Sequence, residues 1–313
     1  MKKAQRPLAV VAAGVLSLAA AIPEGAVAVA FRNVYLRMGD GIVLEVHHLE
    51  GMLLSSKRGA PPVFDDQGSF TLRIDSGEIA MSASSLSRLL NQHVFAYEGS
   101  PLSDLEISIE NGHIKQKGTL HKGVAVPFTV VALPSATPDG RIRLHPTDVK
   151  AAGIPSEGLM KVFGIELADL VKSNRSHGVE IVEDDILLDP GRLLPEPGLA
   201  GHLTAVTLEG DRIVERFGPG TRGALAREAD RRARNYMYYR GNRLRFGKLT
   251  MSDTDMQLID ADPDDPFDFY PAQYVKQLVA GYSKNTASGA LRVYMPDFDQ
   301  AAGADLRPTR VLH

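Results

Sequence analysis

The chain has 313 residues and contains neither cysteine nor tryptophan; its 35 basic and 38 acidic residues give a formal net charge of −3. The lack of cysteine excludes disulfides, thiol catalysis and cysteine metal sites, so the fold must depend on its apolar core. The nearly balanced charge gives no indication of nucleic-acid binding, which is typical of strongly basic surfaces.

The first thirty residues have the composition of a secretory signal peptide. Two lysines and an arginine precede an apolar run over residues 8–22, and small residues follow. The run is shorter than the roughly 20 residues that a membrane span needs, and Ala28 and Ala30 each end a small-x-small cleavage pattern. We predict cleavage of residues 1–30 near Ala28 or Ala30 and export to the periplasm or the extracellular space. Retention of the segment as an anchor is the alternative.

Residues 31–144 alternate apolar and polar side chains in short runs, with turn residues between the runs. A period of two is typical of antiparallel strands that have one covered face. A short helix interrupts the strands at SASSLSRLLNQHVF, where serines offer N-caps and leucines recur at helical spacing. The apolar side of this helix carries Leu86, Leu89 and Leu90.

The stretch LEISIENGHIKQKGTL, residues 105–120, predicts a hairpin that turns at Asn111-Gly112, because both central positions of a two-residue turn need positive φ. Pairing outward from the turn places Ile109 opposite Ile114 and acidic side chains opposite basic ones. One face of the hairpin is therefore apolar and the other charged. The apolar face, which we expect to cover a core or a ligand, carries Leu105, Ile107 and Ile109.

The clearest amphipathic helix is predicted over residues 156–173, SEGLMKVFGIELADLVKS. Its apolar stripe, spaced for one helical face, includes Met160, Phe163, Leu167 and Leu170. A second amphipathic hairpin follows around residues 210–211. Because strands do not alternate with helices, a doubly wound parallel sheet is not expected. We predict an α+β fold that is mainly antiparallel β, with a curved sheet wrapped around one or two amphipathic helices.

The last third of the chain has a different composition. Ten Arg or Lys stand against two acids over residues 216–248, and seven Asp follow without a base over residues 253–268. We predict a helix over about 224–239, further strands, and a final helix over 271–283. Together they form an additional C-terminal α/β segment.

Gly218, Gly220 and Gly223 form the pattern G-x-G-x-x-G between a predicted strand and a predicted helix. A dinucleotide site is not expected, because no acid stands about 20 residues further on and no βαβ series surrounds the motif. A glycine-rich turn is the simpler interpretation. The alternative is that Arg222 and Arg227, near the helix start, hold an anionic group such as a lipid phosphate.

The acidic stretch DADPDDPFD places Asp260, Asp262 and Asp264 at alternate positions, as a calcium loop does with its first ligands. The rest of that loop is missing, so a solvated acidic turn is the default interpretation and an irregular calcium site the alternative. No histidine spacing fits zinc, and no nucleophile motif is complete. We therefore predict no metal, no cofactor and no catalytic residue.

The stretch over residues 77–217 resembles a known family. The residues that carry the resemblance are, in order, GEIAMSASSLSRLLN, LSDLEISIENGHIKQKGTL, VPFTVVALPSATPDGRIRLHPTDVKAAGIP and LLPEPGLAGHLTAVTLEGDRIVERF. In the order of their elements they look like the LmeA-like bacterial envelope proteins, which bind phospholipid and are related to the tubular lipid-binding (TULIP) superfamily. The resemblance implies a curved antiparallel sheet around a helix, with an apolar crevice for acyl chains. It supplies no catalytic residue and does not extend over residues 222–313.

The predicted organisation is a signal peptide (1–30), a curved-sheet domain of the lipid-binding kind (31–217), and a C-terminal extension (218–313) packed on or continuing the same sheet. We expect a non-catalytic protein that holds acyl chains in an apolar groove between sheet and helix. Phospholipid or another acyl-chain ligand is the expected partner, with an anionic membrane surface or an envelope protein as further partners.

Each groove candidate has ordinary core packing as its alternative. The candidates are Leu86, Leu89, Leu90, Leu105, Ile107, Ile109, Met160, Phe163, Leu167 and Leu170. Two other functions stay open, a scaffold or assembly protein of the cell envelope and a hydrolase acting on lipid or polysaccharide.

Overall fold

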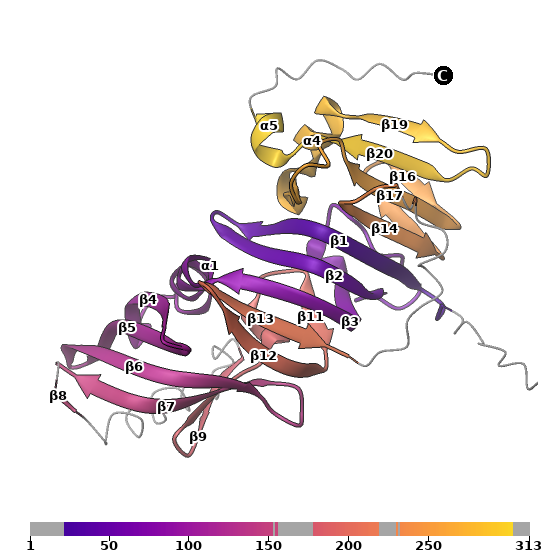
Figure 1. The fold of residues 1–313 in the computed structure, drawn as a ribbon. Coiled ribbons are helices and arrows are strands. Elements are labelled where there is room, and N and C mark those ends of the chain that lie inside the picture. The colour runs from indigo at the N-terminus through magenta and orange to yellow at the C-terminus, as the bar shows by residue number, and fades with distance from the viewer. Residues whose placement is uncertain (1–21, 153, 156–177, 219–229, 231, 303–313) are drawn as a thin grey trace, which may run out of the picture.

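The computed structural model describes residues 22–152, 154–155, 178–218, 230 and 232–302. Figure 1 shows two large β-sheets arranged along the length of the molecule, with a few short helices beside them. Most strand pairs are antiparallel. The predicted α+β fold dominated by antiparallel sheet is therefore confirmed.

The larger sheet has eleven strands in the order β12-β13-β3-β2-β1-β14-β17-β20-β19, with β11 paired to β3 and β18 to β1. It combines strands from both ends of the chain, so the C-terminal strands continue the sheet that the N-terminal strands begin. Its strands are β1 (Ala26–Gly39), β2 (Ile42–Ser55), β3 (Phe70–Ser82), β11 (Gly198–Gly201), β12 (Leu203–Glu209), β13 (Arg212–Phe217), β14 (Tyr236–Gly241), β17 (Thr254–Asp260), β18 (Phe267–Phe269), β19 (Tyr282–Asn285) and β20 (Leu291–Met295). A separate ribbon pairs β15 (Leu244–Phe246) with β16 (Leu249–Met251).

Strand β1 lies inside the larger sheet, and its first residues are buried on both faces. Val27 and Val29 join the main core, whereas Ala28 and Ala30 pack with Tyr238 on the other face. This double burial explains why AVAVAF is continuously apolar. The predicted cleavage sites at Ala28 and Ala30 therefore fall within a strand that pairs with both β2 and β14.

The smaller sheet has seven strands in the order β4-β5-β6-β7-β10-β9, with β8 added beside β7. Its long strands are antiparallel neighbours joined by short turns, as the sequence predicts. The strands are β4 (Leu102–Glu110), β5 (His113–Lys122), β6 (Val124–Ala136), β7 (Ile142–Ala151), β8 (Ile154–Pro155), β9 (Val179–Val182) and β10 (Asp185–Leu188).

The β4–β5 hairpin turns at residues 111–112, and both have positive φ. Its register places Ile109 opposite Ile114 and Glu106 opposite Lys117. Both the turn and the register predicted from the sequence are confirmed. The charged side faces outward, so the apolar side is free to pack inside the molecule.

The helices in the described part of the chain are short: α1 (Ala83–Leu89), α3 (Pro190–Leu193), α4 (Tyr274–Ala280) and α5 (Phe298–Ala302). Helix α1 begins where the sequence predicts it, because the Ser82 hydroxyl accepts the backbone N–H of Ser85 over 3.1 Å as an N-cap. A π-helical turn over Leu90–Val94 continues it. This short helical unit lies between the two sheets (Figure 1).

The helix predicted over residues 224–239 is wrong at its C-terminal end. Tyr236–Gly241 forms strand β14, which pairs with β1 on one side and β17 on the other. The run Tyr-Met-Tyr-Tyr suits a strand, and the two flanking strands complete its hydrogen bonds, so tertiary pairing overrides the helical spacing. Residues 219–229, and the amphipathic helix predicted over residues 156–173, lie outside the described residues.

Candidate functional site

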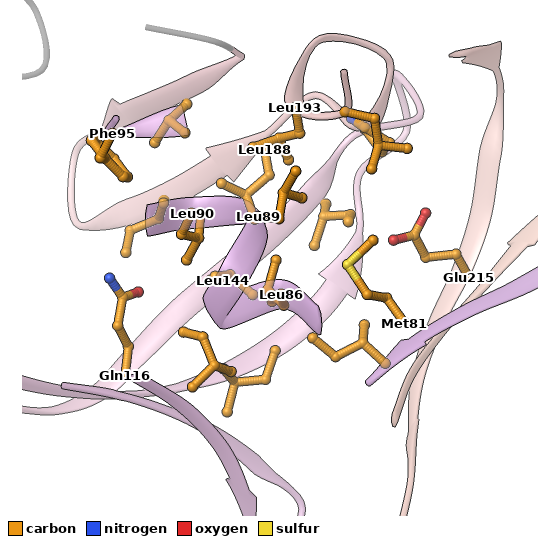
Figure 2. Close-up of a pocket in the computed structure, with 18 of the residues that line it drawn as sticks. Met81, Leu86, Leu89, Leu90, Phe95, Gln116, Leu144, Leu188, Leu193 and Glu215 are labelled. Atoms are coloured by element: carbon orange, nitrogen blue, oxygen red, sulfur yellow. The ribbon is translucent and has the colours of Figure 1, made fainter. Parts of the chain in front are cut away.

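An apolar cavity lies between the two sheets and helix α1 (Figure 2). Its volume is about 100 Å³. The larger sheet contributes Leu44, Ile79, Met81, Ile213 and Glu215. Helix α1, the π-helical turn and the residue that follows it contribute Leu86, Leu89, Leu90 and Phe95. The smaller sheet contributes Leu102, Ile107, Ile114, Gln116, Phe128, Val130, Ile142, Leu144, Val179, Ile181, Ile186 and Leu188, and helix α3 with its next residue contributes Pro190, Leu193 and Leu194.

Of these 24 lining residues, 22 are apolar. The exceptions are Glu215 and Gln116. A predominantly apolar wall with a small number of polar groups is typical of sites for small organic ligands.

Glu215 is the one ionisable side chain among the described residues of the cavity wall. It lies on β13 directly opposite Ile79 of β3 and Val206 of β12, which flank it on the same face. Its carboxylate points into the cavity (Figure 2) and makes no hydrogen bond or ion pair with another described residue. Burial, with no charge nearby to offset it, raises the pKa of Glu215 to about 7.

Gln116 reaches the cavity from β5, on the opposite side from Glu215 (Figure 2). It stands in a row across the smaller sheet between Ile107 of β4 and Val130 of β6. Its side-chain amide makes no hydrogen bond with another described residue. The two polar groups therefore stand apart, with apolar wall between them.

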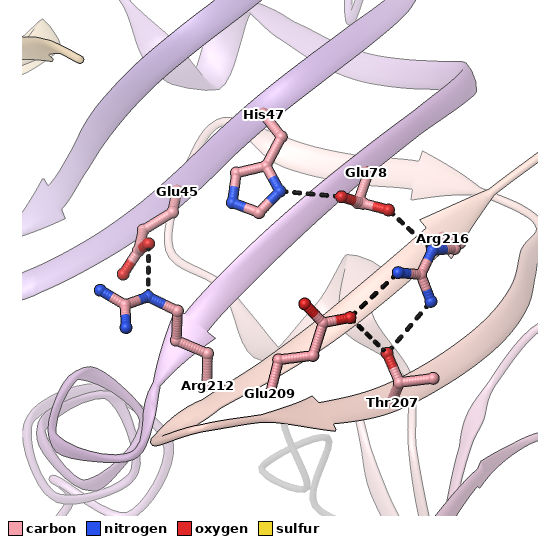
Figure 3. Close-up of polar contacts among 7 residues, drawn as sticks. All are labelled: Glu45, His47, Glu78, Thr207, Glu209, Arg212 and Arg216. Atoms are coloured by element: carbon pink, nitrogen blue, oxygen red, sulfur yellow. Dashed lines mark hydrogen bonds and ion pairs between the residues drawn. The ribbon is translucent and has the colours of Figure 1, made fainter. Parts of the chain in front are cut away.

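The outer face of the same strands of the larger sheet carries paired charges (Figure 3). Arg216 Nε donates to Glu78 Oε2 over 2.7 Å, and its Nη2 donates to Glu209 Oε1 over 3.1 Å. His47 Nδ1 lies 2.9 Å from Glu78 Oε1. The hydrogen bonds from His47 and Arg216 hold the pKa of Glu78 below its ordinary value. These groups satisfy one another, so we assign them a structural role.

The structure divides the sequence-predicted groove residues into three sets. Leu86, Leu89, Leu90 and Ile107 line the cavity. Leu105 is buried and Ile109 packs half-buried against the core, but neither is on the cavity wall. The candidates that lie outside the described residues are Met160, Phe163, Leu167 and Leu170, together with the anion candidates Arg222 and Arg227.

The sequence reasoning missed the two polar lining residues. Glu215 lies between Ile213 and Phe217 in RIVERF, at an inward position where alternation favours an apolar residue. Gln116 lies two residues after Ile114 and shares its face of the hairpin. A polar residue that violates the alternation of a strand was the signal that could have identified both.

The acidic stretch after β17 is not arranged as a calcium loop. Asp260 Oδ2 accepts from Asn235 Nδ2 over 3.0 Å, and its Oδ1 accepts the backbone N–H of Asp262 over 2.9 Å. Burial raises the pKa of Asp260 to about 6. Within the described ranges, no three His, Cys, Asp or Glu side chains come close enough together to hold a metal ion.

Comparisons with protein families, with curated proteins and with solved structures find no match to this chain. None of the helices in the described part of the chain has the length and apolar character to cross a membrane. The chemistry of the cavity is therefore the main guide to function.

Proposed function

We propose that this chain is an exported, non-catalytic protein that holds the acyl chains of a lipid in the cavity between its two sheets. The observation that carries the proposal is the lining, in which 22 of the 24 described side chains are apolar. Water in such a space finds few hydrogen-bond partners, and hydrocarbon displaces it readily.

The size of the hydrophobic effect is sufficient for binding. Each buried CH2 group contributes about 0.8 kcal/mol, so about ten methylenes contribute about 8 kcal/mol. Part of this is lost in ordering the ligand. The remainder corresponds to affinities from millimolar to micromolar before any polar contact is counted.

Two features of the sequence support the proposal. The resemblance of residues 77–217 to LmeA-like envelope proteins implies an acyl-chain crevice between sheet and helix, and the cavity has strands on two sides and α1 on another. The signal-peptide composition of the N-terminus, whose apolar run ends at residue 22, agrees with export to the cell envelope. A hydrolase needs several convergent titratable groups, and the described cavity wall carries only Glu215.

The competing occupant of the cavity is the chain itself. Residues 156–177 include the apolar stripe predicted from the sequence, which has suitable chemistry to cover an apolar wall. In that case the interior is an ordinary core, and the protein takes up no lipid.

The test is native mass spectrometry of the full chain purified from its own envelope, followed by uptake from vesicles of phosphatidylethanolamine and phosphatidylglycerol that also contain monooleoylglycerol. We expect a copurifying lipid and renewed uptake after its removal. Leu86→Trp fills the cavity and is expected to lose most of the bound lipid. Leu133→Trp, at a position that is 42% exposed on β6, is the matched control and is expected to keep it. A wild-type chain with neither copurifying lipid nor uptake would contradict the proposal.

A further inference from the structure

The cavity wall departs from its apolar character at Glu215, where a carboxyl group faces the interior without a partner among the described residues. Glu215 is half-buried at this wall, and a carboxyl group among apolar side chains without a hydrogen-bond partner is unfavourable, so such groups are uncommon in folded chains. The position is also inward by register, since Glu215 pairs with Ile79. A ligand that supplies the missing partner would account for this side chain.

Among the described residues, the elements around Glu215 offer no cation. On β13 and β3, its neighbours inside the cavity are Ile213, Ile79 and Met81, and on β12 it is flanked by Val206. Across the cavity, α1, α3 and the smaller sheet contribute apolar residues and Gln116.

The charged groups on these same strands of the larger sheet lie on the outer face, because side chains alternate along a strand. Arg216 is engaged there by Glu78 and Glu209, and Arg212 by Glu45 over 2.8 Å (Figure 3). Neither arginine reaches the carboxylate of Glu215. No cation among the described residues offsets its negative charge, which leaves a proton or a group on the ligand to do so.

Resting on the lipid-binding function proposed above, we propose that Glu215 selects the ligand by accepting a hydrogen bond from an uncharged donor, a hydroxyl or amide, at the polar end of the lipid. A carboxylate or phosphate in that place would set two negative charges side by side in an apolar site without a cation. The cavity therefore favours neutral acyl lipids such as monoacylglycerols over lipids whose buried end is an anion.

The geometry also gives the ligand a direction. With its polar end at Glu215, the acyl chain lies along Leu86, Leu89 and Leu90 toward the side of Gln116 (Figure 2). Because burial raises the pKa of Glu215 to about 7, its carboxylate is protonated increasingly below that pH. Discrimination against an anionic lipid is then expected to weaken in acid.

The test compares 1-monolauroylglycerol with laurate, which have the same acyl chain, by isothermal titration of the delipidated full chain. At about pH 8.5 we expect the wild type to bind the glyceride at least about tenfold more tightly than laurate, and at about pH 6 we expect a smaller ratio. Glu215→Gln keeps an acceptor without the charge and is expected to bring the ratio below about threefold at both pH values. Glu209→Gln, an exposed glutamate on the same hairpin, is the matched control and keeps the wild-type ratio.

A second variant tests the hydrogen bond itself. Glu215→Met fills a similar volume without an acceptor and is expected to weaken glyceride binding about tenfold. Circular dichroism checks that each variant is folded. If neither probe binds the wild type, the lipid-binding function fails as well. If both probes bind equally and Glu215→Gln leaves their ratio unchanged, the selective role of Glu215 is overturned while lipid binding stands.

Discussion

The larger sheet is covered in two different ways across its width. At β1 and β14 protein covers both faces, with Val27 and Val29 in the main core and Ala28 packed with Tyr238 on the other side. At β3 and β13 the outer face carries paired charges and the inner face borders the cavity. The lack of a partner for Glu215 among the described residues is therefore specific to the cavity and is not a general property of this sheet.

Two glutamates in neighbouring positions of the β3–β13 ladder make the contrast sharper. Arg216 pairs in register with Glu78, and the next residue, Glu215, pairs with Ile79. On the outside, the hydrogen bonds of His47 and Arg216 hold the pKa of Glu78 below its ordinary value. On the inside, burial raises the pKa of Glu215 to about 7. The side of the sheet decides the direction of the shift.

The largest expected effect comes from truncating β1, where protein covers both faces of the larger sheet. A chain that starts at Phe31 lacks the first half of β1, including Val27 and Val29, which are fully buried. Each of these side chains contributes about 1.5–3 kcal/mol, and two flanking strands also lose hydrogen bonds, against a total stability of about 5–15 kcal/mol. We expect this chain to be unfolded by circular dichroism and a chain starting at Ile22 to be folded.

The same reasoning predicts the processed form. Sequencing of the mature N-terminus should find a start at or before Ala26, because β1 begins there. A mature protein that starts at Val29 or Phe31 and unfolds cooperatively would contradict the importance of this half-strand.

The second prediction concerns the inner face at the cavity. Ile79 is 1% exposed and lies opposite Glu215, so Ile79→Ala is expected to lower the free energy of unfolding by about 3 kcal/mol. Urea unfolding measures the loss. Val182→Ala, at a position that is 44% exposed, is the control and should change stability by less than about 0.5 kcal/mol. Equal effects of the two changes would mean that the inner face is loosely packed.

The third prediction uses the pH dependence of Glu215. Its folded pKa of about 7 lies above the ordinary value of 4.5, so the folded chain binds the proton more tightly than the unfolded chain. Its contribution to stability therefore falls as pH rises from about 4.5 to about 7 and is level above that. Glu215→Gln should be more stable than the wild type at about pH 8, by at most about 3 kcal/mol, and similar to it at about pH 4.5. A difference in stability between Glu215→Gln and the wild type that stays constant over this pH range would contradict the raised pKa of Glu215.

The smallest effect is expected on the outer face. The folded pKa of Glu78 is lowered, so its stabilising contribution is present above the ordinary value and is lost as the pH falls through the folded value. At neutral pH, Glu78→Gln should lower the free energy of unfolding by about 1 kcal/mol, and about 1 M salt should reduce this difference. Glu106→Gln is the control, because Glu106 lies 3.9 Å from Lys117 and both are exposed. If Glu78→Gln lowered the free energy of unfolding more than Ile79→Ala does, the outer face would contribute more to stability than the inner face, contrary to this expectation.

The local parts of the fold were predictable because their causes are local. The turn at residues 111–112 and the serine cap of α1 depend on a few neighbouring residues, and both occur where the sequence predicts them. The helix prediction for residues 236–239 was wrong because their conformation depends on β1 and β17, which are distant in sequence. A helical spacing of apolar residues does not reveal that two strands will flank the segment.

The sequence by itself determined the antiparallel class, the register of the β4–β5 hairpin and four lining residues, Leu86, Leu89, Leu90 and Ile107. Alternation and helical spacing encode which side of an element is apolar. The tertiary structure alone decided that two sheets face each other across a cavity and that Glu215 and Gln116 stand on its wall. Local patterns define the faces of each element, but packing between distant strands decides what each face meets.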